Sequence, residues 1–386
     1  MSRRWRILVG ANVPPDANSG AAGTVVETCR ALVTLDQQVE AFWAADIGRR
    51  VKHGNLHNLL ELPIRYRQIV RHRMAQRQFD VIQLSQPHGY LAGKWVLARP
   101  NRPLMVWRSH GLEAKVDDAL ARFAPDKSCL PVKMLRASIR TASAAVQRSS
   151  MRWSDGAIVP CQDDKDVLVE RFGADPERVR VIWHGVPDEY IELPMNDDPA
   201  RWHRLLHVSQ LSVNKGPALM HRVAGEILTQ CRQATMTWVC PIATHRQVRE
   251  SLPDEVRSRV ELVGWMDREK LVQHYDRHGI FLFPTLAEGA AKVVMEAMAR
   301  GMCVVSSNTS GPRDYIRDGQ NGVLVPVGNA ENMAQAAILL IRNSTVCPEM
   351  GGRAKKSAAA FRWLRCAREI TEFYCDLEEM KEMKIR

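Results

Sequence analysis

Two glutamates eight positions apart, Glu288 and Glu296, are the residues whose type and spacing most directly indicate chemistry. They lie in AEGAAKVVMEAMARG (287–301), with Lys292 midway between them. If this segment is one helix, eight residues rise about 12 Å, whereas carboxylates that act on one glycosidic bond lie about 5–9.5 Å apart. We therefore expect two grips on an elongated ligand, with a phosphate group held between them at the helix N-terminus.

Short apolar runs alternate with helix-length segments along the whole chain, which is typical of βαβ units and parallel sheets. In the first half the runs that predict strands are 6–13, 39–45, 80–85, 104–110, 155–161 and 179–185. In the second half they are 205–211, 234–242, 259–265, 279–285, 302–308 and 322–327. The fold class we predict is α/β, with two doubly wound Rossmann-like domains that face a central cleft.

The segment 187–200, PDEYIELPMNDDPA, interrupts this alternation, because it is acidic, rich in proline and without periodicity. We predict an interdomain linker there. The domains are then expected at 1–190 and 200–363, and ligands at the carboxyl ends of their strands.

The segment FPTLAEGAAKVVMEAMARGMCVVSSNTSGPRDYIRDGQNGVLVP (283–326) closely resembles the donor-binding segment of family 4 retaining glycosyltransferases, which have the GT-B fold. The resemblance extends along most of the chain, and it implies that the C-terminal helix 364–386 packs back on the first domain. It gives Glu288 the hydroxyls of a donor sugar and Glu296 the ribose of a nucleoside diphosphate. Further donor contacts are expected from Gly289 and Ala290.

The loop LLHVSQLSVNKG (205–216) resembles the family's diphosphate-binding loop, in which a Gly-Arg pair and a Lys-Gly pair are usual. Lys215-Gly216 matches, but Ser209-Gln210 stands where Gly-Arg is expected. Glutamine can hydrogen-bond a phosphate but carries no charge. We hypothesise that Lys292 supplies the charge missing at Gln210; the alternative is a lysine whose stem lies along the surface.

In the first domain, the loop after the first strand resembles the family's glycine-rich loop, and Gly20 and Gly23 are its matching positions. His110 directly follows the strand 104–110, where the family often has a histidine that contacts the donor sugar. With Glu288 it is our predicted catalytic residue. His184 stands where the family usually has asparagine, and we assign it no role.

The positive charge of the chain lies in its first part. Residues 1–152 hold 24 Lys and Arg against 11 Asp and Glu, while the net charge of the whole chain is +11. The segments 65–77 and 133–152 concentrate this charge, and the second alternates arginines with apolar residues at helical spacing. Such a face is typical of contact with an anionic membrane surface, or simply of a solvated helix. No nucleic-acid-binding module accompanies it, so we expect no nucleic acid partner.

Nine scattered cysteines without a C-x-x-C pair indicate reduced thiols in a cytoplasmic protein. No apolar run approaches the length of a membrane span, and no side-chain cluster has metal-ligand spacing. We therefore expect no metal and no cofactor, and a location in the cytoplasm or on the inner face of the membrane.

The function we predict is the transfer of a sugar from a nucleotide sugar, with retention, to a hydroxyl of a glycan, glycolipid or small molecule. Synthesis of cell-surface polysaccharide or glycolipid is one setting for this reaction. The alternatives are a non-catalytic GT-B binding or regulatory protein, which the Ser209-Gln210 departure favours, and another GT-B enzyme that uses nucleotide sugars.

Overall fold

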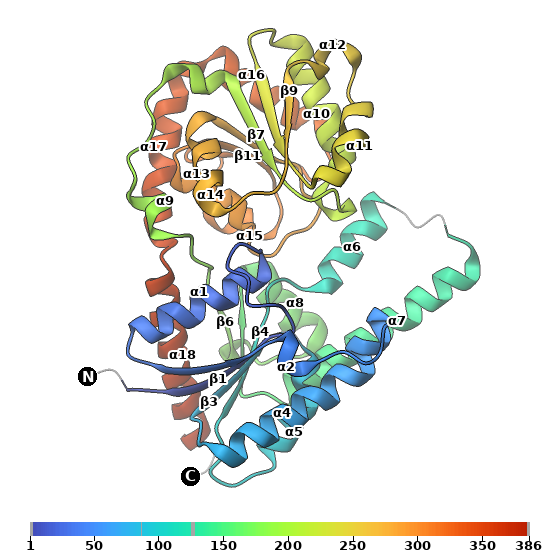
Figure 1. The fold of residues 1–386 in the computed structure, drawn as a ribbon, viewed down its shortest axis with the longest axis vertical. Helices are drawn as coiled ribbons and strands as arrows, with labels where there is room; N and C mark the ends of the chain where they lie inside the picture. The colour runs from blue at the N-terminus through green and yellow to red at the C-terminus, as the bar shows by residue number, and fades with distance from the viewer. Residues whose placement is uncertain (1–2, 86, 125–127, 384–386) are drawn as a thin grey trace. The chain divides into compact units, whose positions relative to one another are not determined.

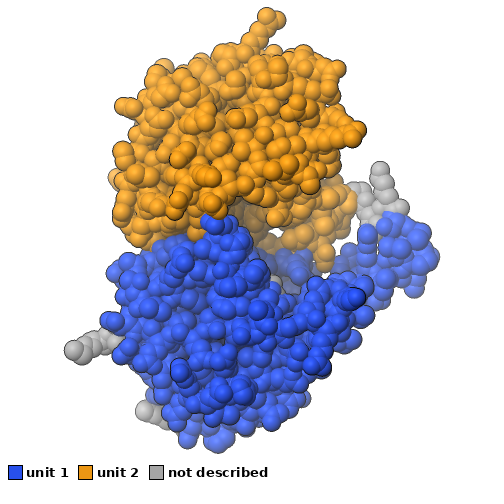
Figure 2. All heavy atoms as spheres, in the orientation of Figure 1, with its two compact units in different colours: residues 1–114, 126–185, 363–386 blue, residues 115–125, 186–362 orange. Residues whose placement is uncertain are grey.

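The computed structural model describes residues 3–85, 87–124 and 128–383. Their contacts divide the chain into two compact units, coloured separately in Figure 2. The first unit comprises 1–114, 126–185 and 363–386, and the second comprises 115–125 and 186–362. Each unit contains a six-stranded sheet (Figure 1).

The first sheet has the order β2-β1-β3-β4-β5-β6, and all its pairs are parallel. Its strands are β1 (Arg6–Gly10), β2 (Gln38–Phe42), β3 (Val81–Ser85), β4 (Leu104–Arg108), β5 (Gly156–Val159) and β6 (Val179–Val181). The central strands β3 and β4 are buried at every position. Because a parallel sheet is covered on both faces, its strands are continuous apolar runs in the sequence.

The helices of the first unit are α1 (Ala21–Thr34), α2 (Ala44–Ile47), α3 (Gly54–Leu56), α4 (Leu62–Gln76), α5 (Tyr90–Leu97), α7 (Leu130–Arg152), α8 (Gln162–Phe172) and α18 (Trp363–Met383). The last of these returns from the far end of the chain to pack beside α1. Its Tyr374 is buried, donates a hydrogen bond to Gln83 Oε1 at 2.8 Å and meets the ring of Trp5 edge to face. The helix α6 (Glu113–Phe123) runs across the boundary between the units.

The second sheet has the order β12-β11-β10-β7-β8-β9 and is also parallel throughout. Its strands are β7 (Arg204–Val208), β8 (Thr235–Val239), β9 (Val260–Val263), β10 (Ile280–Phe283), β11 (Cys303–Ser307) and β12 (Val323–Val325). The helices are α9 (Asp188–Glu192), α10 (Pro217–Gln230), α11 (His245–Glu250), α12 (Asp254–Arg257), α13 (Arg268–Arg277), α14 (Lys292–Ala299), α15 (Ser310–Tyr315), α16 (Ala330–Arg342) and α17 (Cys347–Ser357).

Every predicted run overlaps a strand of the structure, with β2 and β7 beginning one residue before their runs, so the prediction of two doubly wound α/β sheets is confirmed. Most runs are longer than their strands, since they continue into the turn after the strand. All nine cysteines are free, and six of them are buried.

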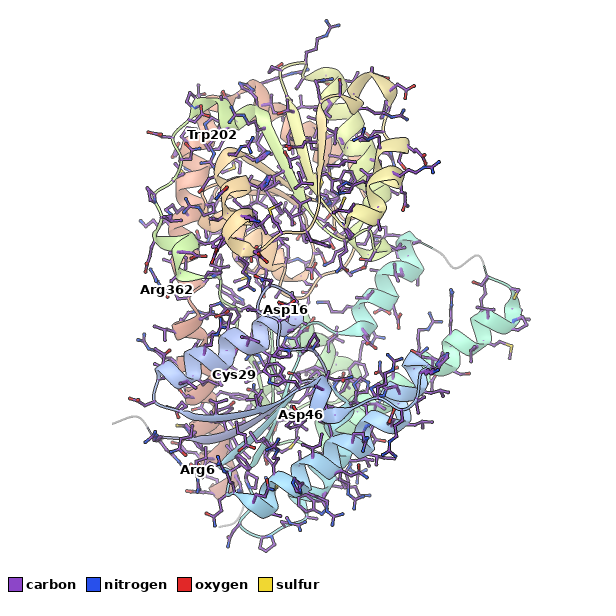
Figure 3. The ribbon with its side chains drawn as sticks, viewed as in Figure 1. Arg6, Asp16, Cys29, Asp46, Trp202 and Arg362 are labelled. Atoms are coloured by element: carbon purple, nitrogen blue, oxygen red, sulfur yellow. The ribbon has the colours of Figure 1, made fainter. Side chains whose placement is uncertain are left out.

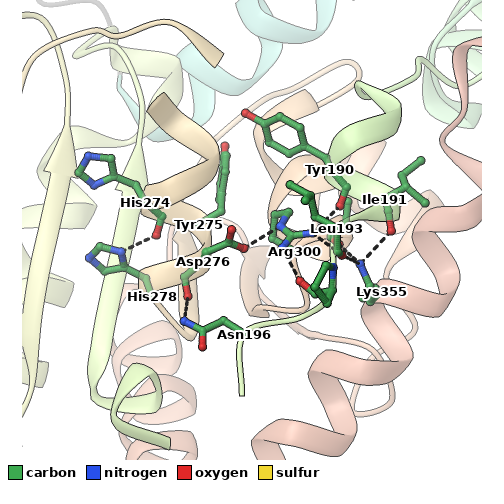
Figure 4. A network of polar contacts seen from close by, with 12 residues as sticks. Tyr190, Ile191, Leu193, Asn196, His274, Tyr275, Asp276, His278, Arg300 and Lys355 are labelled. Carbon is green, nitrogen blue, oxygen red and sulfur yellow. Dashed lines mark hydrogen bonds and ion pairs between the residues drawn. The ribbon is translucent and has the colours of Figure 1, made fainter. Parts of the chain in front are cut away.

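The segment 187–200, which we predicted as a linker, packs on the second unit and contains the short helix α9. Arg300, whose side chain is 1% exposed, forms an ion pair with Asp276 at 2.7 Å. The same guanidinium donates hydrogen bonds to the carbonyl oxygens of Tyr190, Leu193 and Pro194 (Figure 4). The chain therefore reaches the second unit directly after Gly185, because buried arginine donors satisfy a backbone that forms little regular structure of its own.

Candidate functional site

The candidate site of the second unit lies where the order of its strands reverses. From the central strand β7 the chain continues to β8 on one side, and it later returns to β10 on the other side. Ligands of doubly wound sheets bind at such a switch point, outside the carboxyl ends of the strands. The loop after β7 contains Gln210 and Lys215, and the loop after β10 contains Glu288.

Lys215 and Glu288 meet across this switch point, because the Lys215 ammonium is hydrogen-bonded to the Glu288 carboxylate as an ion pair. Their side chains are 26% and 14% exposed, so both remain within reach of a ligand. The two loops are also joined by their backbones, since Leu286 N donates to Asn214 O at 2.7 Å. The structure thus brings together two residues that the sequence predicted separately.

Gly216 allows this close approach of the two loops. Its φ of +67° is in the left-handed region, and a Cβ at this position would lie 2.1 Å from the carbonyl oxygen of Pro284. A glycine avoids both the steric cost of this conformation and the overlap. Pro217 then occupies the first turn of α10, where proline is well accommodated.

The helix after Glu288 begins later than predicted. α14 starts at Lys292, and residues 288–291 form a loop. The rise of about 12 Å for a continuous helix therefore does not apply to the two glutamates. Ala291 precedes the helix with φ 43° and ψ 56°, an unusual conformation for a residue other than glycine. Such strain, stored next to candidate ligand-binding groups, is itself an indication of a functional site.

The loop 288–291 is supported by both ends of the short helix α15. Tyr315 donates a hydrogen bond to the carbonyl oxygen of Ala290, and a Cβ at Gly311 would lie 2.2 Å from the carbonyl oxygen of Gly289. These contacts hold Gly289 and Ala290, both predicted as donor-binding residues, against α15. We assigned no role to Tyr315 or Gly311 from the sequence, although both lie in the quoted SGPRDYI segment.

Glu296 lies one turn inside α14 and is 4% exposed. Its Oε2 accepts a hydrogen bond from the buried hydroxyl of Tyr275 at 2.9 Å. Burial, together with the negative charge of Glu296, raises the pKa of Tyr275, so the tyrosine stays protonated as a donor. Tyr275 thus positions one oxygen of a predicted ribose-binding carboxylate, and it has no distinctive signal in the sequence.

Gln210 and Lys292, which we linked by the hypothesis of a replaced positive charge, differ in their surroundings. Gln210 is exposed at the start of the loop after β7, while the neighbouring Ser209 is buried and donates to Gln210 O at 2.8 Å. Lys292 is the first residue of α14 and is half-buried. Its role as a replacement for a charge at Gln210 stays a prediction.

In the first unit, Gly20 ends the loop before α1, and Gly23 lies in the first turn of α1. The loop is organised by Asp16, labelled in Figure 3, whose Oδ1 accepts from Asn18 N at 2.9 Å. Gly20 is the N-cap of α1 with φ −63°, and a Cβ there would meet nothing within 4 Å. The fold alone therefore does not require glycine at position 20.

His110 follows β4, and its Nε2 lies 3.4 Å from Ser85 Oγ at the end of β3. The ring of His184 lies 5.9 Å from that of His110 and stacks on Trp363 at 6.3 Å. The structure therefore adds His184 to the neighbourhood of a predicted catalytic residue, although we assigned it no role from the sequence. Its position shortly after β6 is the sequence signal that could have indicated it.

Metal-binding clusters and membrane-spanning helices are both absent from the described residues. Within residues 3–85, 87–124 and 128–383, no three His, Cys, Asp or Glu side chains gather in a way that could hold a metal ion. Over the same residues, none of the helices has the length and apolar character that a membrane span requires.

Comparisons with known proteins identify the family of both units. The family model for glycosyl transferases group 1 matches residues 203–343, and the model for glycosyltransferase family 4 matches residues 18–190. The amylovoran biosynthesis glycosyltransferase AmsK of Erwinia amylovora is 33% identical over 179 residues, which span 44% of this chain and 43% of AmsK. A D-inositol 3-phosphate glycosyltransferase of Streptomyces bingchenggensis is 23% identical over 91% of this chain and 83% of its own length.

Solved structures agree with this assignment at the level of the fold. Sucrose-phosphate synthase from Thermosynechococcus elongatus matches 97% of this chain and 100% of its own chain, with a TM-score of 0.74 and 18% identity. HepE from Anabaena, in complex with UDP and glucose, matches 95% of this chain and 98% of its own, with a TM-score of 0.68 and 15% identity. The chain therefore belongs to the GT-B glycosyltransferases of the family 4 type.

Proposed function

We propose that this glycosyltransferase moves a sugar from a nucleoside-diphosphate sugar to an acceptor hydroxyl, with retention at the anomeric carbon. The observation that carries this proposal is the meeting of Lys215 and Glu288 at the switch point between β7 and β10. A cation and a carboxylate at one edge of a sheet match the two halves of such a donor, a charged diphosphate and a sugar with hydroxyl groups.

Each group has a distinct part in the proposed reaction. Negative charge develops on the leaving diphosphate, and fixed donors contribute most where such charge appears. Lys215, Gln210 and Lys292 would bind the diphosphate, and Glu288 and His110 would orient the sugar ring. Glu296, already fixed by Tyr275, would accept hydrogen bonds from the ribose.

The donor class is supported by what related structures hold. HepE has been solved with UDP-glucose and with UDP and glucose, and a starch synthase from Arabidopsis thaliana with ADP and acarbose. A uridine or adenosine diphosphate sugar is therefore the first donor to test on this chain.

We further propose that the acceptor is a growing polysaccharide or glycolipid at the cytoplasmic face of an anionic membrane. The name of AmsK refers to biosynthesis of a polysaccharide, amylovoran. In the first unit, the N-terminal half of α7 is exposed, with Leu130, Met134 and Leu135 between 61% and 70% accessible. Lys133 and Arg140 are exposed on the same helix, and such a basic, apolar surface suits anionic lipid.

The test is a donor screen followed by turnover. UDP-glucose and other nucleotide sugars that bind the folded chain raise its unfolding midpoint, and the donor with the largest shift is then assayed for hydrolysis and transfer. Glu288→Gln is expected to lower kcat by about 100-fold, as loss of one fixed transition-state contact does. Glu331→Gln, an exposed glutamate of α16, is the matched control and retains activity.

Two results would count against the proposal. If nucleotide sugars bind but neither wild type nor control turns them over, a non-catalytic GT-B protein is favoured, as the neutral Gln210 suggests. If turnover occurs but the anomeric configuration of the product is inverted, the retaining mechanism is wrong.

A further inference from the structure

A cavity lies in the first unit, at the amino ends of its strands, whereas His110 follows the carboxyl end of β4. Its volume is about 400 Å³, within the range of small-molecule sites. Its walls come from the segment 99–102 before β4, the segment 154–155 before β5, Arg178 before β6, and the C-terminal part of α18. These are the amino ends of three strands, whereas substrates of doubly wound sheets bind at the carboxyl ends. The cavity is therefore separate from the site of sugar transfer.

The lining of this cavity is strongly positive. Five basic side chains contribute to it, with Asp155 as the single carboxylate; they are Arg99, Arg102, Arg152, Arg178 and Lys381. Asp155 is already engaged, because Arg102 donates to both of its oxygens at 2.6 and 2.8 Å and Met105 N donates to one of them at 2.8 Å. One carboxylate thus fixes one arginine, in a lining that has five basic side chains.

Two of the remaining arginines are held by aromatic rings. The guanidinium of Arg99 lies 3.5 Å from the ring centre of Trp95, and that of Arg152 lies 5.1 Å from that of Trp153. Over the described part of the chain, neither forms an ion pair with a carboxylate. Stacking occupies the face of a guanidinium and leaves its N–H edge for a ligand, and that edge matches the geometry of phosphate oxygens.

Lys381 completes the basic lining from α18. Its Nζ donates to the carbonyl oxygen of Arg102 at 2.7 Å. Burial and the nearby charge of Arg102 lower the pKa of Lys381, although Asp155 acts in the opposite direction, so the charge of Lys381 is disfavoured beside Arg102. Leu97, Pro100, Leu377 and Met380 line the same cavity and give it apolar walls beside the charges.

We propose that this cavity binds a phosphate ester, with the phosphate held by Arg99, Arg152 and Lys381 and the esterified group against the apolar walls. The chemistry is shared by two sources, a soluble phosphorylated metabolite and the headgroup of an anionic phospholipid. In either case the ligand acts at a second site, away from the residues that bind the sugar donor.

Inorganic phosphate is the first probe, added to the full chain at constant ionic strength while the unfolding midpoint is measured. We expect phosphate to raise the midpoint of wild type. The Arg99→Ala/Arg152→Ala variant should need at least about tenfold more phosphate for the same shift. Both arginines are exposed, so these substitutions leave the fold intact. Arg249→Ala/Arg368→Ala removes two exposed arginines elsewhere and should respond as wild type does. Equal responses of all three proteins, or equal losses in both variants, would overturn the proposal.

A second set of probes separates the two sources. Glycerol 3-phosphate that stabilises wild type but not Lys381→Gln indicates a soluble ester. Vesicles of phosphatidylglycerol that sediment wild type but not Arg99→Ala/Arg152→Ala indicate a lipid headgroup. If no phosphate-bearing probe binds in a way that these variants weaken, the proposal is wrong. The readouts do not use donor turnover, so they stay informative even if the proposed sugar transfer fails.

Discussion

The ion pair between Lys215 and Glu288 has a direct consequence for donor binding. In the structure each group neutralises the other, while the proposed function gives each a different part of the donor. A partly exposed ion pair contributes only about 0–1 kcal/mol. Little free energy is therefore lost when a diphosphate replaces Glu288 as the partner of Lys215. Under the proposed function, we expect the pair to keep both side chains in place until a donor binds and separates them.

Lys292 is the residue whose role can be tested most simply. If it supplies charge to the donor diphosphate, Lys292→Ala should weaken donor binding by about three- to tenfold, close to 1 kcal/mol. Calorimetric titration with the best donor measures this change. Lys356→Ala, an exposed lysine of α17, should leave the dissociation constant as it is. Unchanged affinity in Lys292→Ala would reject the hypothesis.

Gly216 should tolerate no side chain. Gly216→Ala places a Cβ 2.1 Å from the Pro284 carbonyl at a left-handed φ, and the conformation alone costs about 1–2 kcal/mol. Denaturant unfolding should show a loss of at least that amount. Gly352→Ala is the matched control, since it lies inside α17 with nothing within 4 Å of its Cβ. It should instead stabilise the chain by about 0.4–1 kcal/mol, and a similar loss in both variants would contradict this account.

Among the elements, α7 changes its environment along its length. Val146 and Ser150 near its C-terminal end are buried, whereas Leu135 is exposed. The exposed half gains nothing from burial against the rest of its unit. An apolar, basic helix face of this kind is stabilised when a membrane covers it.

Leu135→Glu should therefore reduce binding to anionic vesicles by about tenfold or more, because it adds a negative charge to the apolar surface. Flotation with vesicles that contain phosphatidylglycerol measures this change. Leu339→Glu alters an equally exposed leucine of α16 and should float as wild type does. Equal flotation of both variants would exclude α7 as the membrane contact.

Arg300 is one of the buried side chains that hold the segment 186–198, together with Arg201, which donates to the carbonyl oxygen of Asn196. Arg300→Met removes the partner of Asp276 and the donor to three carbonyl groups, and breaking a buried ion pair of this kind costs about 3–5 kcal/mol. Urea unfolding of the full chain measures the loss. Arg353→Met, whose side chain is 43% exposed, should cost less than about 1 kcal/mol; an equal effect would show that Arg300 does not anchor this segment.

At the scale of the whole molecule, buried histidines predict how stability changes with pH. Burial lowers the pKa of His207 and of His278 to about 4, whereas a histidine in the unfolded chain titrates near 6.5. Between these values the unfolded chain binds protons that the folded chain does not. Lower pH therefore favours unfolding, by up to about 1.4 kcal/mol per pH unit for each histidine.

The free energy of unfolding should accordingly fall between pH 6.5 and pH 4. His207→Gln keeps a polar side chain that can donate to the Leu282 carbonyl but cannot titrate, so its stability should decline less steeply with acid. Denaturant unfolding at pH 7, 6 and 5 measures both slopes. The same slope in wild type and His207→Gln would show that His207 is not responsible.

The strands were predictable because the information for them is local. Strands such as 280–283 are covered on both faces and appear in the sequence as continuous apolar runs. The contacts of the segment 187–200 were not predictable, because they are not local. Its prolines and acidic residues resemble a linker, while the arginine that fastens it stands about a hundred positions later.

By itself, the sequence determined the two parallel sheets, the family resemblance and the loops that carry Lys215 and Glu288. Only the tertiary structure decided that these two residues pair, that Tyr275 holds Glu296 and that His184 lies beside His110. The tertiary structure also decided that Ala291 has a left-handed backbone conformation and that α14 begins only at Lys292. The physical reason is that apolar periodicity acts between neighbours in the chain, whereas hydrogen bonds and ion pairs join residues that only the completed sheet brings together.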